Sequence, residues 1–569
     1  MRAAFSRWTL GFAIAAVATA LLLAEAAWAQ EAAGTWHGTL SLPNGVIRLG
    51  VRLAPAGDGL AGVIYSPEQS GAEAPLADVR RDANRLSFAY QPVGGRFEGA
   101  WDPQVSAWVG DWVSAAGRLP LTLSRGDIPK APAVEGLDGN WQGALAIGER
   151  KLRIVVRVKT GTYGTVALLD SPDQLAAGIV LSDFARKGDE VSFAQPKLRI
   201  SFAGKLSADG QSIVGAFTQG GTLPLTLTRF TPTLSARPQT PQKPYPYREA
   251  EVAIDSVPGV RLACTLTSPE GEGRFPAAFL ITGSGPQDRD ETLVRHKPFL
   301  VLADHLTRHG IAVLRCDDRG FGKSTGDFSA ATSADFAADA EAAVAFLRAR
   351  PGIDPARIGL IGHSEGGMIA PMVAARDPRI AFVVMLAGPG VPSRALMTAQ
   401  REAIGRASGA SAAAMTRSET LSTRIDEAIA QSQDWEAAKT DVVKILGAEA
   451  AALGVPTDTL LARSQLVLTP WYRDFIRYDP RPTLAKLRMP VLALNGSNDT
   501  QVVASQNLPA IRTALKDDPD ATVEELPGLN HLFQTSKTGA PTEYAAIEET
   551  FAPSALKIIS DWIAARVGR

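Results

Sequence analysis

Net charge, cysteine and histidine are all scarce in this sequence. Its 58 basic and 59 acidic side chains nearly balance, which leaves a formal net charge of −1 at pH 7. This balance argues against nucleic acid or an anionic membrane surface as the main partner. The two cysteines and six histidines form no cluster with the spacing of metal ligands, so neither a metal site nor a cofactor is expected.

Long apolar runs are also scarce, and the one near the N-terminus is short for a membrane span. It covers residues 10–24, follows Arg2 and Arg7, and leads into Ala-Trp-Ala. This pattern is typical of a secretory signal peptide over residues 1–29 that is cleaved after Ala29. We therefore expect a periplasmic or secreted protein without stable membrane insertion. An uncleaved N-terminal anchor is the alternative, whereas a lipid anchor would need a cysteine after the apolar run.

An exported protein can form disulfides, and the two cysteines lie in predicted strands. Cys264 falls in RLACTLTS and Cys316 in IAVLRC, and these two strands could be neighbours in one sheet. A cross-strand disulfide is therefore conceivable, but such pairs are uncommon, and buried cysteine usually acts as a small apolar side chain. The sequence leaves both alternatives open. Neither cysteine has a base nearby, so neither is a candidate nucleophile.

The first positive feature is an internal repeat. GTWHGTL at 34–40 recurs as GNWQGAL at 139–145, and LPLTLSR recurs as LPLTLTR farther along. The offset is 104 or 105 residues throughout, which indicates two homologous units over 31–126 and 135–230. Alternating apolar residues and regularly spaced glycine-rich turns predict that each unit is all-β, a small barrel or sandwich.

The repeats share no constellation of titratable residues, so no chemistry is assigned to them. Trp36 and Trp141 are expected to fill the two cores, with ligand stacking as the alternative. Packing against the rest of the chain, dimerisation or weak ligand capture are possible roles. Residues 231–248 are rich in proline and predict an extended, semi-rigid linker to a second region, residues 249–569.

The second positive feature is the decapeptide IGLIGHSEGG at 358–367. A branched apolar run leads into Gly-His-Ser-Glu-Gly, and a helical pattern follows at once. This order predicts a G-x-S-x-G nucleophile elbow, with the Ser364 hydroxyl exposed at the end of a strand and the Glu365 N–H at the start of a helix. A chance pentapeptide is the alternative.

A serine hydroxyl needs a base, which should be one of the histidines. His531, in the loop LPGLNHLF, has the chain position expected in a Ser…Asp…His order. His363 adjoins the serine, but neighbouring side chains on a sharp turn should diverge. Asp499 follows the apolar strand PVLAL, and a carboxylate there would orient and stabilise the imidazole. The alternatives are a loop histidine that caps a turn and a solvated turn aspartate.

An oxyanion hole needs two backbone donors. One is the Glu365 N–H. The other is expected after the apolar run 277–281, where Gly-Ser-Gly lets the backbone approach a developing anion closely. We nominate the Ser284 N–H first and the Gly285 N–H second, although Gly-Ser-Gly is also an ordinary loop composition.

Six segments together resemble the bacterial α/β-hydrolase esterases related to the serine aminopeptidase-like hydrolases. They are ITGSGPQDRD, CDDRGFGKSTG, IGLIGHSEGG, PWYRDFIRYDP, PVLALNGSNDTQV and LPGLNHLFQ. The resemblance covers about residues 249–569 and implies a carboxylic ester hydrolase with Ser364, Asp499 and His531 as its triad. One departure is Thr282-Gly283, where many relatives have His-Gly. The segment DDRGFGKSTG lacks the spacing of a phosphate-binding loop, and we expect a structural loop with a buried Arg–carboxylate pair.

A long helical pattern between the expected nucleophile and acid, about residues 393–480, predicts a helical cap over the active site. Trp471, Tyr472 and Phe475 give it an aromatic face that packs on the sheet or lines a substrate pocket.

The expected protein is thus an α/β hydrolase preceded by two all-β repeats, an exported serine hydrolase that cleaves small-molecule esters through an acyl-enzyme. The alternatives are a peptidase or amidase of the aminopeptidase-like branch, a thioesterase, and a non-catalytic protein that binds through its β repeats.

Overall fold

A computed structural model describes residues 32–568, apart from 43–44, 58, 83, 91–93, 115–116, 149, 175, 232–234, 456, 458–459 and 462–463. The predicted signal peptide, residues 1–29, lies outside the described residues. The chain divides into two compact units, one that holds the repeats and one that holds the residues from Pro232 onward. Across the described residues, no helix combines the length and apolarity that a membrane crossing requires.

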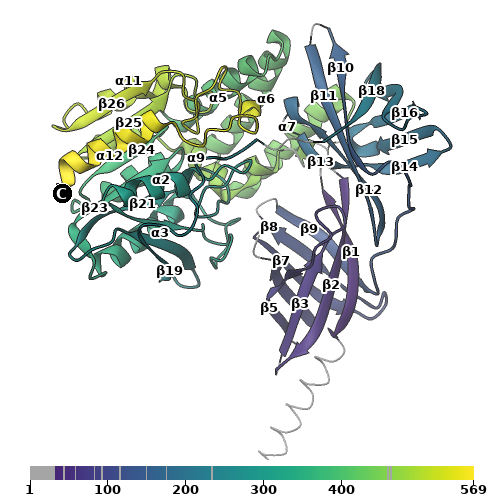
Figure 1. Ribbon diagram of the computed structural model, residues 1–569, viewed down its shortest axis with the longest axis horizontal. Helices are drawn as coiled ribbons and strands as arrows, with labels where there is room; N and C mark the ends of the chain where they lie inside the picture. Colours follow the sequence, from purple (N-terminus) through teal and green to yellow (C-terminus); the bar gives the residue numbers. More distant parts are fainter. Residues whose placement is uncertain are drawn as a thin grey trace, which may run out of the picture. The chain divides into compact units, whose positions relative to one another are not determined.

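The first repeat is an antiparallel meander of nine strands (Figure 1). The strands run in the order β4-β3-β2-β1-β9-β8-β7-β6-β5, and the sheet is nearly closed, because β3 also contacts β5. They are β1 (Gly34–Leu42), β2 (Gly45–Ala56), β3 (Gly59–Tyr65), β4 (Ala74–Pro75), β5 (Ala77–Asp82), β6 (Arg85–Tyr90), β7 (Gly95–Asp102), β8 (Ala107–Ser114) and β9 (Gly117–Arg125).

The second repeat has the same topology, in the order β13-β12-β11-β10-β18-β17-β16-β15-β14. Both repeats are therefore barrel-like sheets, whereas the sequence alone did not distinguish a barrel from a sandwich. The strands are β10 (Gly139–Ile147), β11 (Arg150–Gly161), β12 (Gly164–Ser171), β13 (Ala176–Val180), β14 (Ser182–Lys187), β15 (Glu190–Gln195), β16 (Ile200–Leu206), β17 (Ser212–Thr218) and β18 (Thr222–Phe230).

The repeated tryptophans fill equivalent places in the two cores. Trp36 and Trp141 are both buried, and each indole N–H donates to a backbone carbonyl four residues earlier, at 2.8 Å. A guanidinium lies over each ring, from Arg125 in the first repeat and Arg229 in the second. The same contacts in both repeats fit the core-filling role expected from the sequence.

The second unit contains an eight-stranded sheet in the order β19-β20-β22-β21-β23-β24-β25-β26. β20 is antiparallel to both of its neighbours, and the six strands β21 to β26 are parallel to one another. This strand order and direction are those of an α/β-hydrolase sheet. The strands are β19 (Arg248–Asp255), β20 (Arg261–Ser268), β21 (Phe275–Ile281), β22 (Ala312–Cys316), β23 (Ile353–His363), β24 (Val383–Leu386), β25 (Val491–Gly496) and β26 (Ala521–Leu526).

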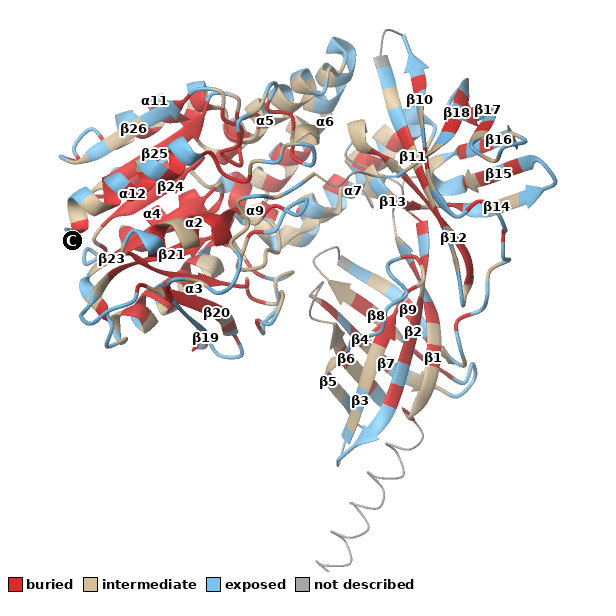
Figure 2. Ribbon diagram, in the orientation of Figure 1, coloured by how far each residue is buried: buried red, intermediate tan, exposed pale blue. Residues whose placement is uncertain are grey.

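Helices cover both faces of this sheet, and its central strands are almost wholly buried (Figure 2). This burial explains why these strands are continuous apolar runs without alternation. α2 packs on α12, and α3 packs on α4. The helices are α2 (Pro298–Arg308), α3 (Ser333–Arg348), α4 (Gly366–Ala374), α10 (Arg481–Leu484), α11 (Ala504–Ala514) and α12 (Pro553–Val567).

The segment between β24 and β25 is helical, as the sequence predicts, and we call residues 393–477 the helical insertion. It has a small core of its own, which includes Ile429, Leu446 and Tyr472. Its helices are α5 (Ser393–Ala407), α6 (Ala412–Gln431), α7 (Trp435–Leu453), η4 (Gln465–Leu468) and α9 (Pro470–Arg477).

The proline-rich segment is a correction to the predicted linker, because residues in its middle are hydrogen-bonded to the unit that carries the α/β-hydrolase sheet, which we call the hydrolase unit. Arg237 donates to the carbonyls of Ala545 and Ile547, at 3.0 and 2.8 Å. The Gln239 side chain donates to the Phe551 carbonyl and accepts from the Thr550 N–H, both at 2.6 Å. Composition indicates an extended segment, but it does not show which backbone groups such a segment will pair with.

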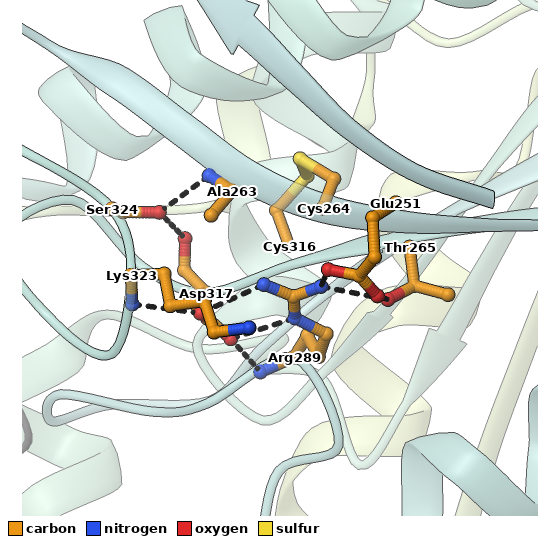
Figure 3. The surroundings of a disulfide bond; sticks show 9 residues. All are labelled: Glu251, Ala263, Cys264, Thr265, Arg289, Cys316, Asp317, Lys323 and Ser324. Carbon is orange, nitrogen blue, oxygen red and sulfur yellow. Dashed lines mark hydrogen bonds and ion pairs between the residues drawn. A yellow bond between two sulfur atoms is a disulfide. The ribbon is translucent and has the colours of Figure 1, made fainter.

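Cys264 and Cys316 form a disulfide between β20 and β22 (Figure 3). The two residues lie directly opposite each other in the antiparallel register, and both are buried. The sequence left the pairing open because it did not fix this register.

We expect the disulfide to stabilise the hydrolase unit. The cysteines are 52 residues apart, and the loop-closure entropy of a cross-link that long is about 4 kcal/mol. Urea unfolding of the hydrolase unit, with and without a reductant, should therefore show a lower midpoint for the reduced protein. The Cys264→Ser/Cys316→Ser variant should match the reduced protein in both conditions. Two titratable thiols in the native oxidised protein would contradict the cross-link.

Candidate active site

Ser364 occupies a strained turn between β23 and α4. Its backbone has φ of 54°, in the left-handed region that residues other than glycine rarely adopt. The Ser364 N–H donates to the Leu386 carbonyl at 2.8 Å, which ties the turn to β24. A side chain at Gly366 would place its Cβ 2.1 Å from the Ile281 carbonyl oxygen, so only glycine fits. The turn has the local geometry of the predicted nucleophile elbow.

Asp499 and His531 are hydrogen-bonded to each other. Asp499 follows β25, His531 lies in the loop after β26, and His531 Nδ1 is 2.8 Å from Asp499 Oδ2. Both side chains are buried, and the other oxygen of Asp499 accepts the N–H groups of Gln501 and Val502 at 2.7 and 2.9 Å. Because an ionised carboxylate only accepts, Nδ1 carries the proton and Nε2 is left as the basic nitrogen.

The predicted oxyanion loop lies against the nucleophile. A Cβ built on Gly283 would be 3.2 Å from the Ser364 Cβ, so the Gly283 backbone directly neighbours that side chain. The Gly283 N–H is occupied by Glu291 Oε1 at 2.8 Å. The N–H groups of Ser284, Gly285 and Glu365 have no acceptor among the described residues, which leaves them free to meet an anion.

The loop that carries His531 reaches the elbow through His363. His363 Nε2 is 2.9 Å from the backbone oxygen of His531, and the two rings lie 4.8 Å apart between centroids. Because His363 directly precedes Ser364, the structure brings the elbow, the oxyanion loop and the His531 loop together. The sequence interpretation set His363 aside as a base, and it did not find Glu291, which no recognisable motif marks.

Acidic residues after β22 support the oxyanion loop. Asp317 accepts two hydrogen bonds from the Arg289 guanidinium, at 2.9 and 3.0 Å (Figure 3). Asp318 accepts from the Thr282 hydroxyl at 2.7 Å and from the Gln287 N–H at 2.8 Å. Thr282 thus anchors the loop through its hydroxyl. Arg319 pairs with buried Asp339, the ion pair expected for this loop.

The Glu365 side chain connects the elbow to the helical insertion. It is 3% exposed, and its Oε1 accepts from the Ser333 hydroxyl at 2.5 Å and from the Trp471 indole N–H at 2.7 Å. Burial raises the pKa of Glu365 to about 7, although both hydrogen bonds favour its ionised form. Protonation of this carboxyl therefore changes near neutral pH.

The three aromatic residues predicted for a substrate pocket are placed differently from one another. Trp471 reaches Glu365 and stacks on Phe475, with ring centroids 4.9 Å apart. Phe475 is buried against the sheet core, whereas Tyr472 belongs to the core of the insertion and donates its hydroxyl to Asp426 at 2.6 Å. Within the described ranges, no three or more His, Cys, Asp or Glu side chains are grouped so that they could hold a metal ion.

Comparisons with known proteins agree with the fold. Residues 258–524 match the model of the X-Pro dipeptidyl-peptidase (S15 family). The chain is 27% identical over 302 residues to Esterase EstD of Thermotoga maritima, which is 53% of this chain and 64% of EstD. It is 38% identical over 87 residues to thiohydrolase apmlB of Arthrinium phaeospermum, 15% of this chain and 27% of that protein.

Two solved structures are also similar. The α/β hydrolase GrgF from Penicillium sp. sh18 has a TM-score of 0.35 at 16% identity, over 56% of this chain and 99% of GrgF. The Pyrococcus furiosus esterase Pf2001 has a TM-score of 0.37 at 14% identity, over 59% of this chain and all of that one. The fold assignment rests on the strand order of the sheet. With the sequence relatives, it supports a hydrolase of the α/β-hydrolase fold.

Replacing Glu365 should change how stability depends on pH. Because the pKa of this acid is about 7 in the folded chain against 4.5 for an unperturbed glutamate, its contribution to stability falls as pH rises from 4.5 to 7. Glu365→Gln keeps an oxygen for Ser333 and Trp471 but cannot ionise. It should therefore gain up to about 3 kcal/mol relative to wild type between pH 5 and pH 8.

Urea unfolding of the hydrolase unit at the two pH values measures this difference. Glu524→Gln, at an exposed position of β26, is the matched control, and its stability should follow that of wild type at both pH values. Parallel pH profiles for Glu365→Gln and wild type would show that the buried carboxyl does not titrate in this range.

Proposed function

We propose that this protein is an exported serine hydrolase that cleaves small-molecule carboxylic esters. The observation that carries the proposal is the buried hydrogen bond between Asp499 and His531 in a loop that also contacts the residue before Ser364. A strained serine, an imidazole oriented by a carboxylate and unoccupied backbone donors are the groups that acyl transfer requires.

In this mechanism His531 Nε2 takes the proton of the Ser364 hydroxyl while Oγ attacks the ester carbonyl. Asp499 holds the imidazole in the correct tautomer and stabilises the imidazolium. The N–H groups of Glu365 and Ser284, with Gly285 as the alternative donor, bind the oxyanion. His531 then protonates the leaving alcohol, and water attacks the acyl-enzyme in a second step of the same kind.

The helical insertion serves in this proposal as a cap, since Trp471 extends from it to the residue after the nucleophile. Small movements of α9 would then change access to Ser364. The N-terminal sequence pattern supports export, and the two barrels serve in this proposal as accessory domains to which no catalytic group is assigned.

A second candidate activity is peptide or amide hydrolysis, because the matched family model describes an X-Pro dipeptidyl-peptidase. The same serine, histidine and aspartate could cleave either bond. The curated relative EstD is named an esterase, and it favours the ester.

A substrate comparison separates the two activities. We expect p-nitrophenyl esters, tested from C2 to C16, to be cleaved with kcat/KM at least about 100-fold above that for aminoacyl and X-Pro p-nitroanilides, since ester leaving groups depart more easily. A preference for the X-Pro anilide would favour the peptidase instead.

Ser364→Ala should reduce kcat by about 10⁵–10⁶-fold while the protein folds normally, by comparison with triad replacements in other hydrolases. Asp499→Asn should reduce kcat by about 10⁴-fold, because the imidazole would adopt the wrong tautomer. A fluorophosphonate probe should label wild type and Ser560→Ala, a buried serine of α12, but not Ser364→Ala. Unlabelled, well-folded wild type would favour a non-catalytic binding protein.

A further inference from the structure

A second histidine, outside the proposed triad, lies on the elbow and bonds the His531 loop directly and the oxyanion loop through Glu291. His363 ends β23, next to Ser364, and its side chain is 8% exposed. Its Nδ1 is 2.8 Å from Glu291 Oε1, and its Nε2 is 2.9 Å from the backbone oxygen of His531. The same Glu291 oxygen accepts the Gly283 N–H at 2.8 Å. The His363 ring and the Glu291 carboxylate therefore connect the elbow, the oxyanion loop and the loop that carries His531.

The hydrogen-bond chemistry fixes the direction of these contacts. A backbone carbonyl can only accept, so His363 Nε2 must carry a proton and donate it to His531. When the Glu291 carboxyl is ionised it can only accept, so Nδ1 also carries a proton and the ring is an imidazolium. Burial alone lowers the pKa of His363, but the Glu291 carboxylate, with help from Asp499, outweighs it and the pKa is raised.

The backbone of Glu291 is strained, which is independent support for a role of this residue in the site. Its φ is 53°, in the left-handed region that L side chains rarely adopt, and its N–H is held by the Asp288 carbonyl at 2.9 Å. The residue is 4% exposed. Strain of this kind persists only where surrounding contacts over-determine it, and it is often found beside functional sites.

Small shifts of these groups would act directly on the proposed chemistry. Gly283 precedes the nominated oxyanion donors, and a Cβ built on it would lie 3.3 Å from Glu291 Oε1 and 3.6 Å from His363 Nδ1. Losing the Glu291 contact would free the Gly283 peptide, and with it the direction of the Ser284 N–H. Losing the His363 contact would leave the backbone carbonyl of His531, the proposed base, without this hydrogen bond.

We propose that His363 and Glu291 are positioning residues that hold the oxyanion loop and the His531 loop in register with Ser364. The inference rests on the proposed serine-hydrolase function. Neither residue touches the reacting atoms, so the pair should affect the rate of the chemical step more than substrate affinity.

The test measures kcat, KM and the fluorophosphonate labelling rate with p-nitrophenyl acetate as substrate. Glu291→Ala and His363→Ala should each lower kcat by about 100-fold, the loss typical of a misplacement near 1 Å, with KM nearly unchanged. The double variant should lose little more than either single variant, because the pair acts as a unit. Glu291→Gln, whose amide oxygen can take the same place and still accept from the Gly283 N–H and from Nδ1–H of His363, should recover most of the activity.

His305→Ala is the matched control. His305 is a partly buried histidine on α2 that bonds the Ser560 hydroxyl. The end of α2 leads into the start of β22, whereas the candidate site lies at the carboxyl ends of the strands. The variant should lower the melting temperature without lowering kcat. Should an alanine variant fail to fold, Glu291→Asp decides, because a side chain one methylene shorter cannot reach both Gly283 and His363, and its kcat should still fall about tenfold.

Two kinds of failure are distinguishable. If folded Glu291 and His363 variants keep wild-type kcat and labelling rate while Ser364→Ala is inactive, the positioning role is wrong and the hydrolase function stands. If Glu291→Gln is no better than Glu291→Ala, the rescue fails and the positioning role is also wrong. If wild type itself is neither labelled nor active, the proposed function falls first.

Discussion

The close approach of backbones at the turn that carries Ser364 is the constraint on which the candidate site depends. A left-handed serine between β23 and α4 is possible only because no side chain stands at Gly366, against the end of β21. That contact places the loop after β21 beside Ser364. The adjacent parallel strands β24 and β25 then deliver Asp499 to the same edge of the sheet. The site is thus a consequence of strand order as much as of side-chain choice.

Buried carboxyl groups at this edge fall into two classes with different electrostatics. Asp317 and Asp339 face guanidinium groups, which offset the cost of burying a charge. Asp318 and Glu365 are held by neutral donors, and burial raises the pKa of both. The ion pairs hold the loop in place, whereas the second class links the surroundings of the elbow to the pH of the solution.

The sequence predicted those parts of the structure that leave a local pattern. Glycine spacing and an apolar run indicated the elbow at Ser364, and the repeat offset indicated two like-folded β units. The order of residues along the chain indicated Asp499 and His531 as the partners of Ser364. Contacts set by three-dimensional register could not be predicted in this way. Whether Cys264 meets Cys316 depends on strand alignment, and Glu291 acts from a loop whose side-chain direction is set by an unusual φ.

The segment before the hydrolase sheet has a consequence for where this chain can be shortened. Arg237 and Gln239 satisfy carbonyls of residues 545–551, close to the C-terminal helix α12. A truncated chain that began at the first residue of β19 would leave those carbonyls without their donors, next to the loop that carries His531. The structural border of the hydrolase unit therefore lies upstream of Arg237, inside what composition alone describes as a spacer.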